Sequence, residues 1–239
     1  MRRSRRCALL SMLAATVVSG CSSSLGKPTP SSVTLAPGAI SNFEQLYSAN
    51  CAGCHGQDGR GGAAIALANP VYLAIADDNV LRKVTANGVP RTAMPAFAQS
   101  AGGMLTDEQI EIIVKGVRSR WGSAEPGNLP SYAPRSAGDA GRGQVTYATF
   151  CAGCHGPEGR GGQKGSSIVD PSFLALVSDQ GLRSVVIAGR PELGAPDFRA
   201  DLPGRAMTEQ DVTDVVAWVA SHRAGDLANP TAPGAKGKQ

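Results

Sequence analysis

One short motif occurs twice in this chain and limits what it can fold around. The pentapeptide Cys-Ala-Gly-Cys-His stands at residues 51–55 and again at residues 151–155. On one turn of helix, residues three and four positions apart share a face, so each copy directs two thiols and one imidazole to the same side. Cysteines and histidine in this order are typical of covalent haem c attachment, with the histidine as an iron ligand.

Two other uses of paired cysteines fit the sequence less well. Zinc sites built from two C-x-x-C pairs usually separate them by about 15–20 residues, much less than the separation seen here. A thioredoxin-like redox pair needs no histidine directly after it. We therefore predict two haem c groups, bound by the following residues: Cys51, Cys54 and His55 in the first copy, and Cys151, Cys154 and His155 in the second.

The start of the chain is typical of a bacterial lipoprotein signal. Four arginines lie within the first six residues, an apolar run covers residues 8–18, and Gly20 precedes Cys21. We expect residues 1–20 to be a signal peptide, Cys21 to be lipidated, and residues 21–38 to form a flexible tether. The alternatives are a plain secretory signal or an uncleaved anchor, but the run is short for a bilayer that needs about 20 apolar residues. An exported protein anchored by lipid, on the periplasmic or extracellular side of a membrane, is the expected result.

Cysteine usage and charge support this organisation. Of the six cysteines, Cys7 lies in the expected signal and Cys21 is the expected lipid site, so the remaining four are the predicted haem thiols. The formal charge of +4 equals the number of arginines in the expected signal. Without that signal the chain is formally neutral, so charge gives no support for a nucleic-acid partner or for binding to anionic lipid.

The two halves of the chain resemble each other beyond the pentapeptide. Gly-x-x-Gly-Arg-Gly-Gly follows both copies, Pro70 is matched by Pro171, and a Thr-led acidic segment at Thr106 returns at Thr208. Such repetition indicates two copies of one structural unit. We predict these regions: domain 1 at 39–121, a linker at 122–137, domain 2 at 138–224, and a disordered tail at 225–239.

Local patterns predict an all-α fold in each half. Ser41 with Glu44 suggests a capping box, and Thr106 and Thr208 stand where N-caps are expected. Apolar residues recur at helical spacing in the last helix of each half. They are Ile110, Ile113, Val114 and Val117 in the first half, and Val212, Val215, Val216 and Val219 in the second.

Taken together, the chain resembles tandem class I cytochrome c domains over residues 39–121 and 138–223. The resemblance implies a small helical bundle around one covalent haem in each half. It implies that Met94, in Thr-Ala-Met-Pro, is the distal iron ligand of the first haem, with Met104 as a rival. It also suggests the carbonyls of Pro70 and Pro171 as acceptors for the iron-bound imidazoles.

The second half departs from this pattern at the distal ligand. Ala195 stands where Met94 stands in the first half, and alanine cannot bind iron. Met207 is then a candidate ligand, and a vacant or water-bound position is the alternative, with His222 and Lys164 as remote options. Glu192, Asp197 and Arg199 are the polar residues around the altered loop.

The resemblance implies single-electron transfer between a membrane respiratory complex, or another redox protein, and an acceptor. Cytochrome subunits of alternative complex III and donors to terminal oxidases are similar proteins. No organic substrate is expected, since each half is used in enclosing a haem. A peroxidase-like enzyme acting at an open second haem is the alternative, and a gas sensor is a third option.

Overall fold

The structure is a computed structural model that describes residues 36–123, 127–199 and 205–223. The expected signal peptide, Cys21, most of the expected tether and the expected tail lie outside the described residues. From Pro37 onward, the described residues belong to one compact unit.

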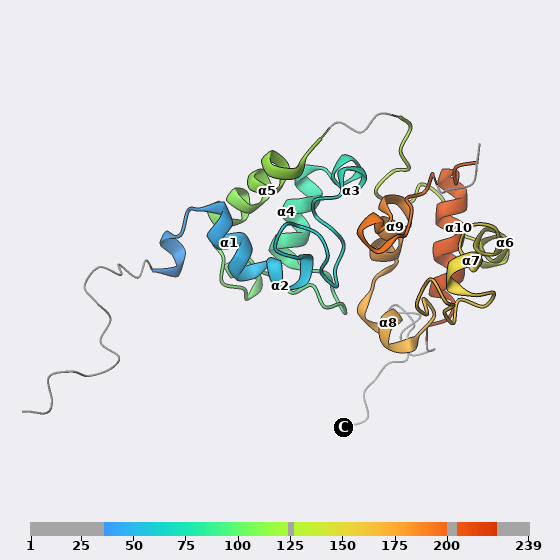
Figure 1. Cartoon of the computed structure of the whole chain (residues 1–239). Helices are drawn as coiled ribbons and strands as arrows, with labels where there is room; N and C mark the ends of the chain where they lie inside the picture. The colour runs from blue at the N-terminus through green and yellow to red at the C-terminus, as the bar shows by residue number, and fades with distance from the viewer. Residues whose placement is uncertain (1–35, 124–126, 200–204, 224–239) are drawn as a thin grey trace, which may run out of the picture. The chain divides into compact units, whose positions relative to one another are not determined.

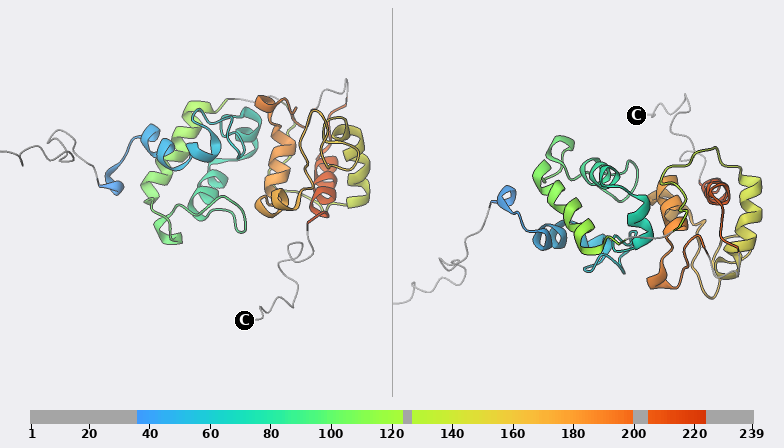
Figure 2. Two further views of the ribbon diagram at one scale, coloured as in Figure 1. Left: turned by 60° about the horizontal axis from the view of Figure 1, so that its bottom comes forward. Right: turned by 90° about the horizontal axis from the view of Figure 1, so that it is seen from above.

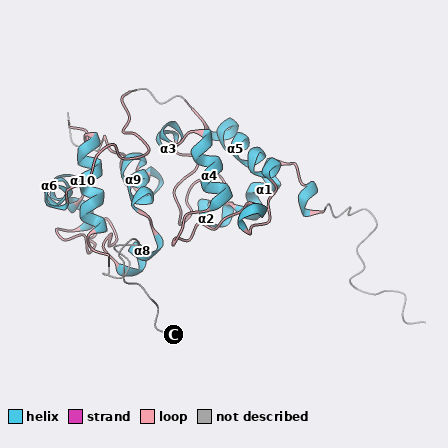
Figure 3. Ribbon diagram, turned by 180° about the vertical axis from the view of Figure 1, so that it is seen from behind, coloured by secondary structure: helices cyan, strands magenta, loops and turns pink. Residues whose placement is uncertain are grey.

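The described residues form α-helices and short 3-10 segments joined by loops, with no strand (Figures 1 and 3). Helices α1 to α5 make up the first repeat and α6 to α10 the second, which confirms the all-α prediction. The first repeat contains η1 (Pro37–Ala39), α1 (Phe43–Asn50), α2 (Ala52–His55), α3 (Pro70–Ile75), α4 (Asp78–Asn87), η2 (Gln99–Ala101) and α5 (Asp107–Trp121). The second contains α6 (Ala140–Phe150), α7 (Ala152–His155), α8 (Pro171–Leu176), α9 (Asp179–Ala188), η3 (Pro191–Leu193) and α10 (Glu209–Ala220).

Capping residues define where the long helices begin. Thr106 and Thr208 are the N-caps of α5 and α10, as predicted, and each forms a full capping box with Gln109 or Asp211. The prediction for Ser41 was wrong. The N-cap of α1 is Asn42, whose side chain accepts a hydrogen bond from the Gln45 amide at 3.0 Å, because the helix begins one residue later than the Ser41 pattern requires.

The last helix of each repeat forms the centre of its core. The predicted apolar positions of α5 and α10 are all buried, at 8% exposure or less. Helix α5 packs against α1 and α4, and α10 packs against α6 and α9. Figure 2 shows this for the second repeat, where α10, in red, lies beside α6, in olive, and α9, in orange. Among the described helices, none is both long and apolar enough to cross a membrane.

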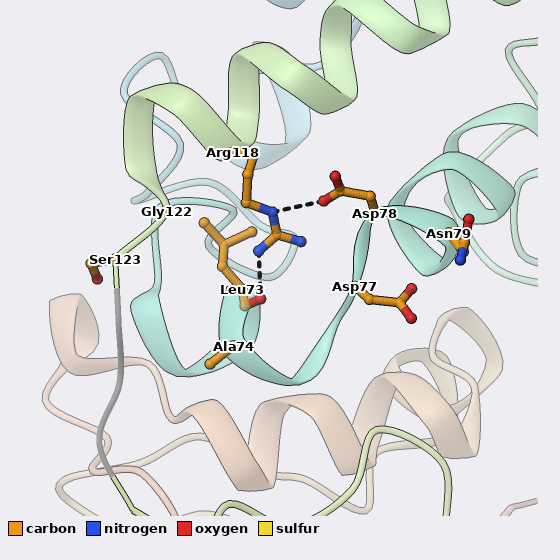
Figure 4. Close-up of a pocket in the computed structure, with 8 residues that line it drawn as sticks. All are labelled: Leu73, Ala74, Asp77, Asp78, Asn79, Arg118, Gly122 and Ser123. Atoms are coloured by element: carbon orange, nitrogen blue, oxygen red, sulfur yellow. Dashed lines mark hydrogen bonds and ion pairs between the residues drawn. The ribbon is translucent and has the colours of Figure 1, made fainter.

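An arginine secures the end of the short helix α3. Arg118 on α5 donates to the Leu73 carbonyl at 2.6 Å and to the Asp78 carboxylate at 2.8 Å (Figure 4). It also donates to the Ala76 carbonyl at 2.6 Å. The shallow pocket around it contains none of the motif cysteines or histidines. The arginine therefore satisfies carbonyls that a helix end leaves without a partner.

In the second repeat, an arginine at a different position makes the same set of hydrogen bonds. Arg223, beyond the end of α10, donates to the carbonyls of Leu174 at 3.1 Å and Val177 at 2.8 Å, and pairs with Asp179. Arg118 instead lies within α5. The two repeats thus share the three acceptors, while the donor lies within the last helix in the first repeat and beyond its end in the second.

Candidate haem attachment sites

Each pentapeptide forms a one-turn helix that directly follows a longer one. Cys51 and Cys151 are the C-caps of α1 and α6. Their backbone amides donate to the backbone carbonyls of Tyr47, at 2.8 Å, and Tyr147, at 2.9 Å. The first cysteine of each pair is partly buried and the second is exposed, and all four thiols are free. One thiol of each pair therefore lies against the protein and the other at its surface.

Burial sets the protonation of the first thiol in each motif. Burial, together with the neighbouring Cys54 or Cys154, raises the pKa of Cys51 to about 12 and that of Cys151 to about 11. Redox C-x-x-C pairs depend on a lowered thiol pKa. Both thiols are thus protonated at neutral pH, which disfavours a redox role for the pair.

The two histidines are held in the same way by the loop that follows each motif. Nδ1 of His55 donates to the Ile65 carbonyl at 2.8 Å, and Nδ1 of His155 donates to the Ser166 carbonyl at 2.7 Å. The prediction of Pro70 and Pro171 as acceptors was wrong, because both prolines instead begin α3 and α8. A proton on Nδ1 leaves the lone pair of Nε2 free for a metal.

The environment of His55 favours its neutral form. The imidazole is 8% exposed. Burial lowers its pKa, the hydrogen bond to Ile65 acts in the opposite direction, and the positive charge of Arg190 lowers the pKa further. A neutral imidazole with a free Nε2, on one helical turn with two free thiols, fits the donor set that haem c requires.

A tyrosine supports each motif helix, a role that was not predicted from the sequence. Tyr47 donates its hydroxyl to the Gly56 carbonyl at 2.9 Å, and Tyr147 donates to the Gly156 carbonyl. The signal that was available is a tyrosine four residues before the first cysteine in both copies. Each ring packs on a tryptophan of the last helix, with ring centroids 5.1 Å apart for Trp121 and 4.1 Å apart for Trp218.

The loop that carries Met94 has a close counterpart in the second repeat. In the first repeat, the Val89 amide donates to the Met94 carbonyl at 3.0 Å. In the second, Arg190 and Ala195 exchange backbone hydrogen bonds at 2.9 and 3.0 Å. The structure therefore places Ala195 at the position of Met94, as the alignment of the repeats predicted.

Glycine allows this loop to approach the preceding helix. Gly88, at the end of α4, has φ 64°, and a Cβ there would lie 2.7 Å from the Met94 carbonyl oxygen. Gly189 repeats this with φ 66° and 2.5 Å to the Pro196 carbonyl oxygen. Positive φ and close approach both favour glycine, so the two loops share one backbone requirement.

Met207 lies at the place of a core leucine. Its amide donates to the Phe198 carbonyl at 2.9 Å, as that of Leu105 donates to Phe97 at 2.8 Å. Met207 is 7% exposed and Leu105 is 5% exposed, and both belong to the apolar core. Met94 is partly buried, whereas its rival Met104 is 74% exposed.

The remote candidates for the second site are found at the end of α10 and on the loop after the second motif. His222 follows the end of α10, where its Nδ1 lies 2.9 Å from the Trp218 carbonyl and its ring packs edge-on against the indole at 4.6 Å. Lys164 is exposed on the loop after the second motif. His222 is therefore part of the packing around Trp218.

Comparison with known families assigns both repeats. The family described as cytochrome c oxidase, cbb3-type, subunit III matches residues 38–115, and the family described as cytochrome c matches residues 140–223. Each match contains one pentapeptide and the helices around it. The chain carries two tandem cytochrome c domains. Such domains indicate haem c as the cofactor.

Related proteins extend the likeness across both cytochrome domains. The chain is 25% identical to a cytochrome bc1 complex cytochrome c subunit of Mycobacterium tuberculosis, over 92% of this chain and 77% of that protein. It is 32% identical to the cbb3-type cytochrome c oxidase subunit CcoP of Rubrivivax gelatinosus, over 53% of this chain and 37% of that protein. A Kuenenia stuttgartiensis reducing HAO-like protein complex has a chain matched with a TM-score of 0.44 and 18% identity, covering 80% of this chain and 100% of that one.

Proposed function

We propose that this chain is an exported, lipid-anchored dihaem cytochrome c that relays single electrons between a membrane respiratory complex and an acceptor. The observation that carries the proposal is the duplicated site, in which two free thiols and an imidazole with a free Nε2 lie on one helical turn. Relatives named as cytochrome c subunits of the bc1 complex and of cbb3 oxidase support a respiratory partner.

The protein groups of each site attach and orient the cofactor. When bound, haem c supplies one-electron exchange between ferric and ferrous iron. In domain 1, Cys51 and Cys54 would attach the ring and His55 would ligate the iron, with the Ile65 carbonyl fixing the imidazole. Cys151, Cys154 and His155 would do the same in domain 2. Ligands held in one orientation favour repeated electron transfer, because little has to move when the iron changes oxidation state.

The distal ligands would make the two haems unequal. We assign Met94 to the first haem, where a thioether stabilises ferrous iron and raises the reduction potential. Two arrangements satisfy the second site, namely ligation by Met207 and a position open to small ligands. The packing of Met207 at the place of Leu105 favours the open position.

A lipid on Cys21 would hold the cytochrome domains close to a membrane partner. The arginine-rich start, the apolar run and the small residue before Cys21 support this assignment. A flexible tether over residues 21–38 would let the domains move between donor and acceptor, on the periplasmic or extracellular side.

The replacement of a methionine by Ala195 also motivates peroxidase-like chemistry as an alternative. Cleavage of peroxide benefits from an acid or base near the open iron position. The carboxylates on this loop are already paired, Glu192 with Arg190 and Asp197 with Arg199, both at 2.5 Å. These ion pairs favour electron transfer over peroxide turnover.

The two functions are separated by mixing fully reduced protein with ferricyanide or with hydrogen peroxide. An electron relay gives up one electron per haem rapidly to ferricyanide and reacts slowly with peroxide. Rapid catalytic consumption of peroxide, lost when the second haem is removed by a Cys151→Ala and Cys154→Ala double substitution, would replace the proposal with the enzymatic alternative.

A further inference from the structure

Arg190 is the residue through which domain 2 contacts the haem attachment loop of domain 1. It comes directly after Gly189 at the end of α9, and its backbone pairs with Ala195. Its Nη2 donates to the Gly62 carbonyl of domain 1 at 2.7 Å. One residue therefore joins the altered distal loop of the second site to the loop that follows the first CAGCH.

The contact point is close to the group that orients His55. Gly62 packs so tightly against the first motif that a Cβ there would lie 2.1 Å from the Cys54 carbonyl oxygen. Three residues later, Ile65 accepts the hydrogen bond from His55 Nδ1. Fixing Gly62 thus restrains the segment that carries the histidine's acceptor.

The Arg190 side chain is partly buried and is held by specific partners. It is 12% exposed, and Nε pairs with Glu192 at 2.5 Å. Nearby, the Asn69 side chain of domain 1 donates to the Ala188 carbonyl of α9 at 2.8 Å, in a fully buried contact between α3 and α9. The domains are therefore joined by specific polar bonds on both sides of Gly189.

We propose that Arg190 is a positioning residue for the first haem site, which holds the loop that orients His55 and places a positive charge near that histidine. The inference rests on the proposed dihaem function. A fixed positive charge stabilises the iron state with one more electron, so it favours reduction of the first haem over the second. Glu192 opposes this charge in part, which predicts opposite effects from neutralising each partner.

The test uses full-length dihaem protein reduced by one electron equivalent, with low-temperature EPR measuring which haem remains ferric. The Met94→Ala variant identifies the signal of the first haem. We expect Arg190→Gln to lower the ratio of reduced first haem to reduced second haem by roughly fivefold or more, and Glu192→Gln to raise it. Arg190→Lys, which keeps the charge but cannot make both bonds, should fall between wild type and Arg190→Gln. Lys83→Gln, which removes an exposed charge on α4, should leave the ratio unchanged.

Equal ratios in wild type, Arg190→Gln and Glu192→Gln, or shifts of both variants in one direction, would overturn the role of Arg190. If Arg190→Gln does not fold, Glu192→Gln and Arg190→Lys carry the same test. Failure of the proposed function gives a different result, because the wild-type protein itself would then lack two haems that share one added electron.

Discussion

Ala195 exchanges two backbone hydrogen bonds with Arg190, at the place where Val89 donates to Met94. The second distal loop has therefore kept its backbone pairing while losing the sulfur. Because the cysteines, the histidine and its carbonyl acceptor are repeated in both domains, the presence of Ala195 at the position of Met94 is the main chemical difference between the sites. We expect this difference to make the two haems unequal.

Carbon monoxide binding measures this inequality directly. With Met94 bound to the first iron and the second position open, ferrous wild-type protein should bind one carbon monoxide per chain, and Met94→Ala should bind two. Met104→Ala, which alters an exposed methionine, should behave as wild type. Wild-type protein that binds none, together with a Met207→Ala variant that binds one, would instead make Met207 the second distal ligand.

The buried arginine of domain 2 gives a stability prediction. The Arg183 side chain is 2% exposed and pairs with Glu209 at 2.5 Å, and Glu209 also accepts from the backbone and hydroxyl of Ser131. Glu209→Gln leaves the buried guanidinium without its counter-ion, so we expect it to destabilise the domain by about 3 kcal/mol, measured by urea unfolding.

The matched control is an exposed ion pair in the same domain. Glu158 and Arg160 are both more than 70% exposed. Glu158→Gln should therefore cost at most about 1 kcal/mol. Equal losses for Glu158→Gln and Glu209→Gln would contradict the importance of the Arg183–Glu209 pair.

The hydrogen bonds from Ser131 to Glu209 also bear on the predicted linker at 122–137. They show that part of this segment is bound to domain 2.

Asp214 predicts how acid affects the stability of domain 2. Burial tends to raise its pKa, but hydrogen bonds from Arg142, the Asp139 amide and Gln210 outweigh this, and the pKa is lowered. A lowered folded-state pKa stabilises the fold above the unfolded-state pKa of about 3.9, and this contribution is lost as pH falls below it. The stability difference between wild type and Asp214→Asn, from urea unfolding at several pH values, should therefore be constant above about pH 5 and shrink between about pH 5 and pH 3. A difference that stays constant over this range would show that Asp214 ionisation does not stabilise the fold.

Each cytochrome domain should depend on its haem for folding. A core built from fewer than about 100 residues is marginal, and the porphyrin supplies missing apolar volume. Apoprotein with Cys51, Cys54, Cys151 and Cys154 all replaced by alanine should lose most of its helical circular dichroism or become molten. A native-like spectrum and a cooperative thermal transition without haem would refute this dependence.

Features encoded by short-range patterns were predictable from the sequence. The caps at Thr106 and Thr208 and the buried positions of α5 and α10 follow from local hydrogen bonding and helical periodicity. Asn42 was missed in favour of Ser41, because two adjacent residues can both cap a helix and only the backbone start decides between them.

Features that depend on loop conformation and on contacts across the fold were not predictable. The Ile65 and Ser166 carbonyls accept from the histidines because glycine-rich loops turn them toward the rings, and the sequence does not specify that turn. Arg118 lies within α5 and Arg223 lies beyond the end of α10, yet both donate to equivalent carbonyls, so alignment of the repeats does not pair them. Arg190 acts on a residue more than 100 positions away.

The central claim is that one chain holds two covalent haems that take up electrons one at a time and at different potentials. An optical redox titration of the purified holoprotein, combined with the mass of the intact chain, tests it most directly. We expect the added mass of two haems and two one-electron steps, with the step at higher potential lowered in Met94→Ala. A mass corresponding to one haem or none, or a single step that Met94→Ala leaves unchanged, would contradict the account.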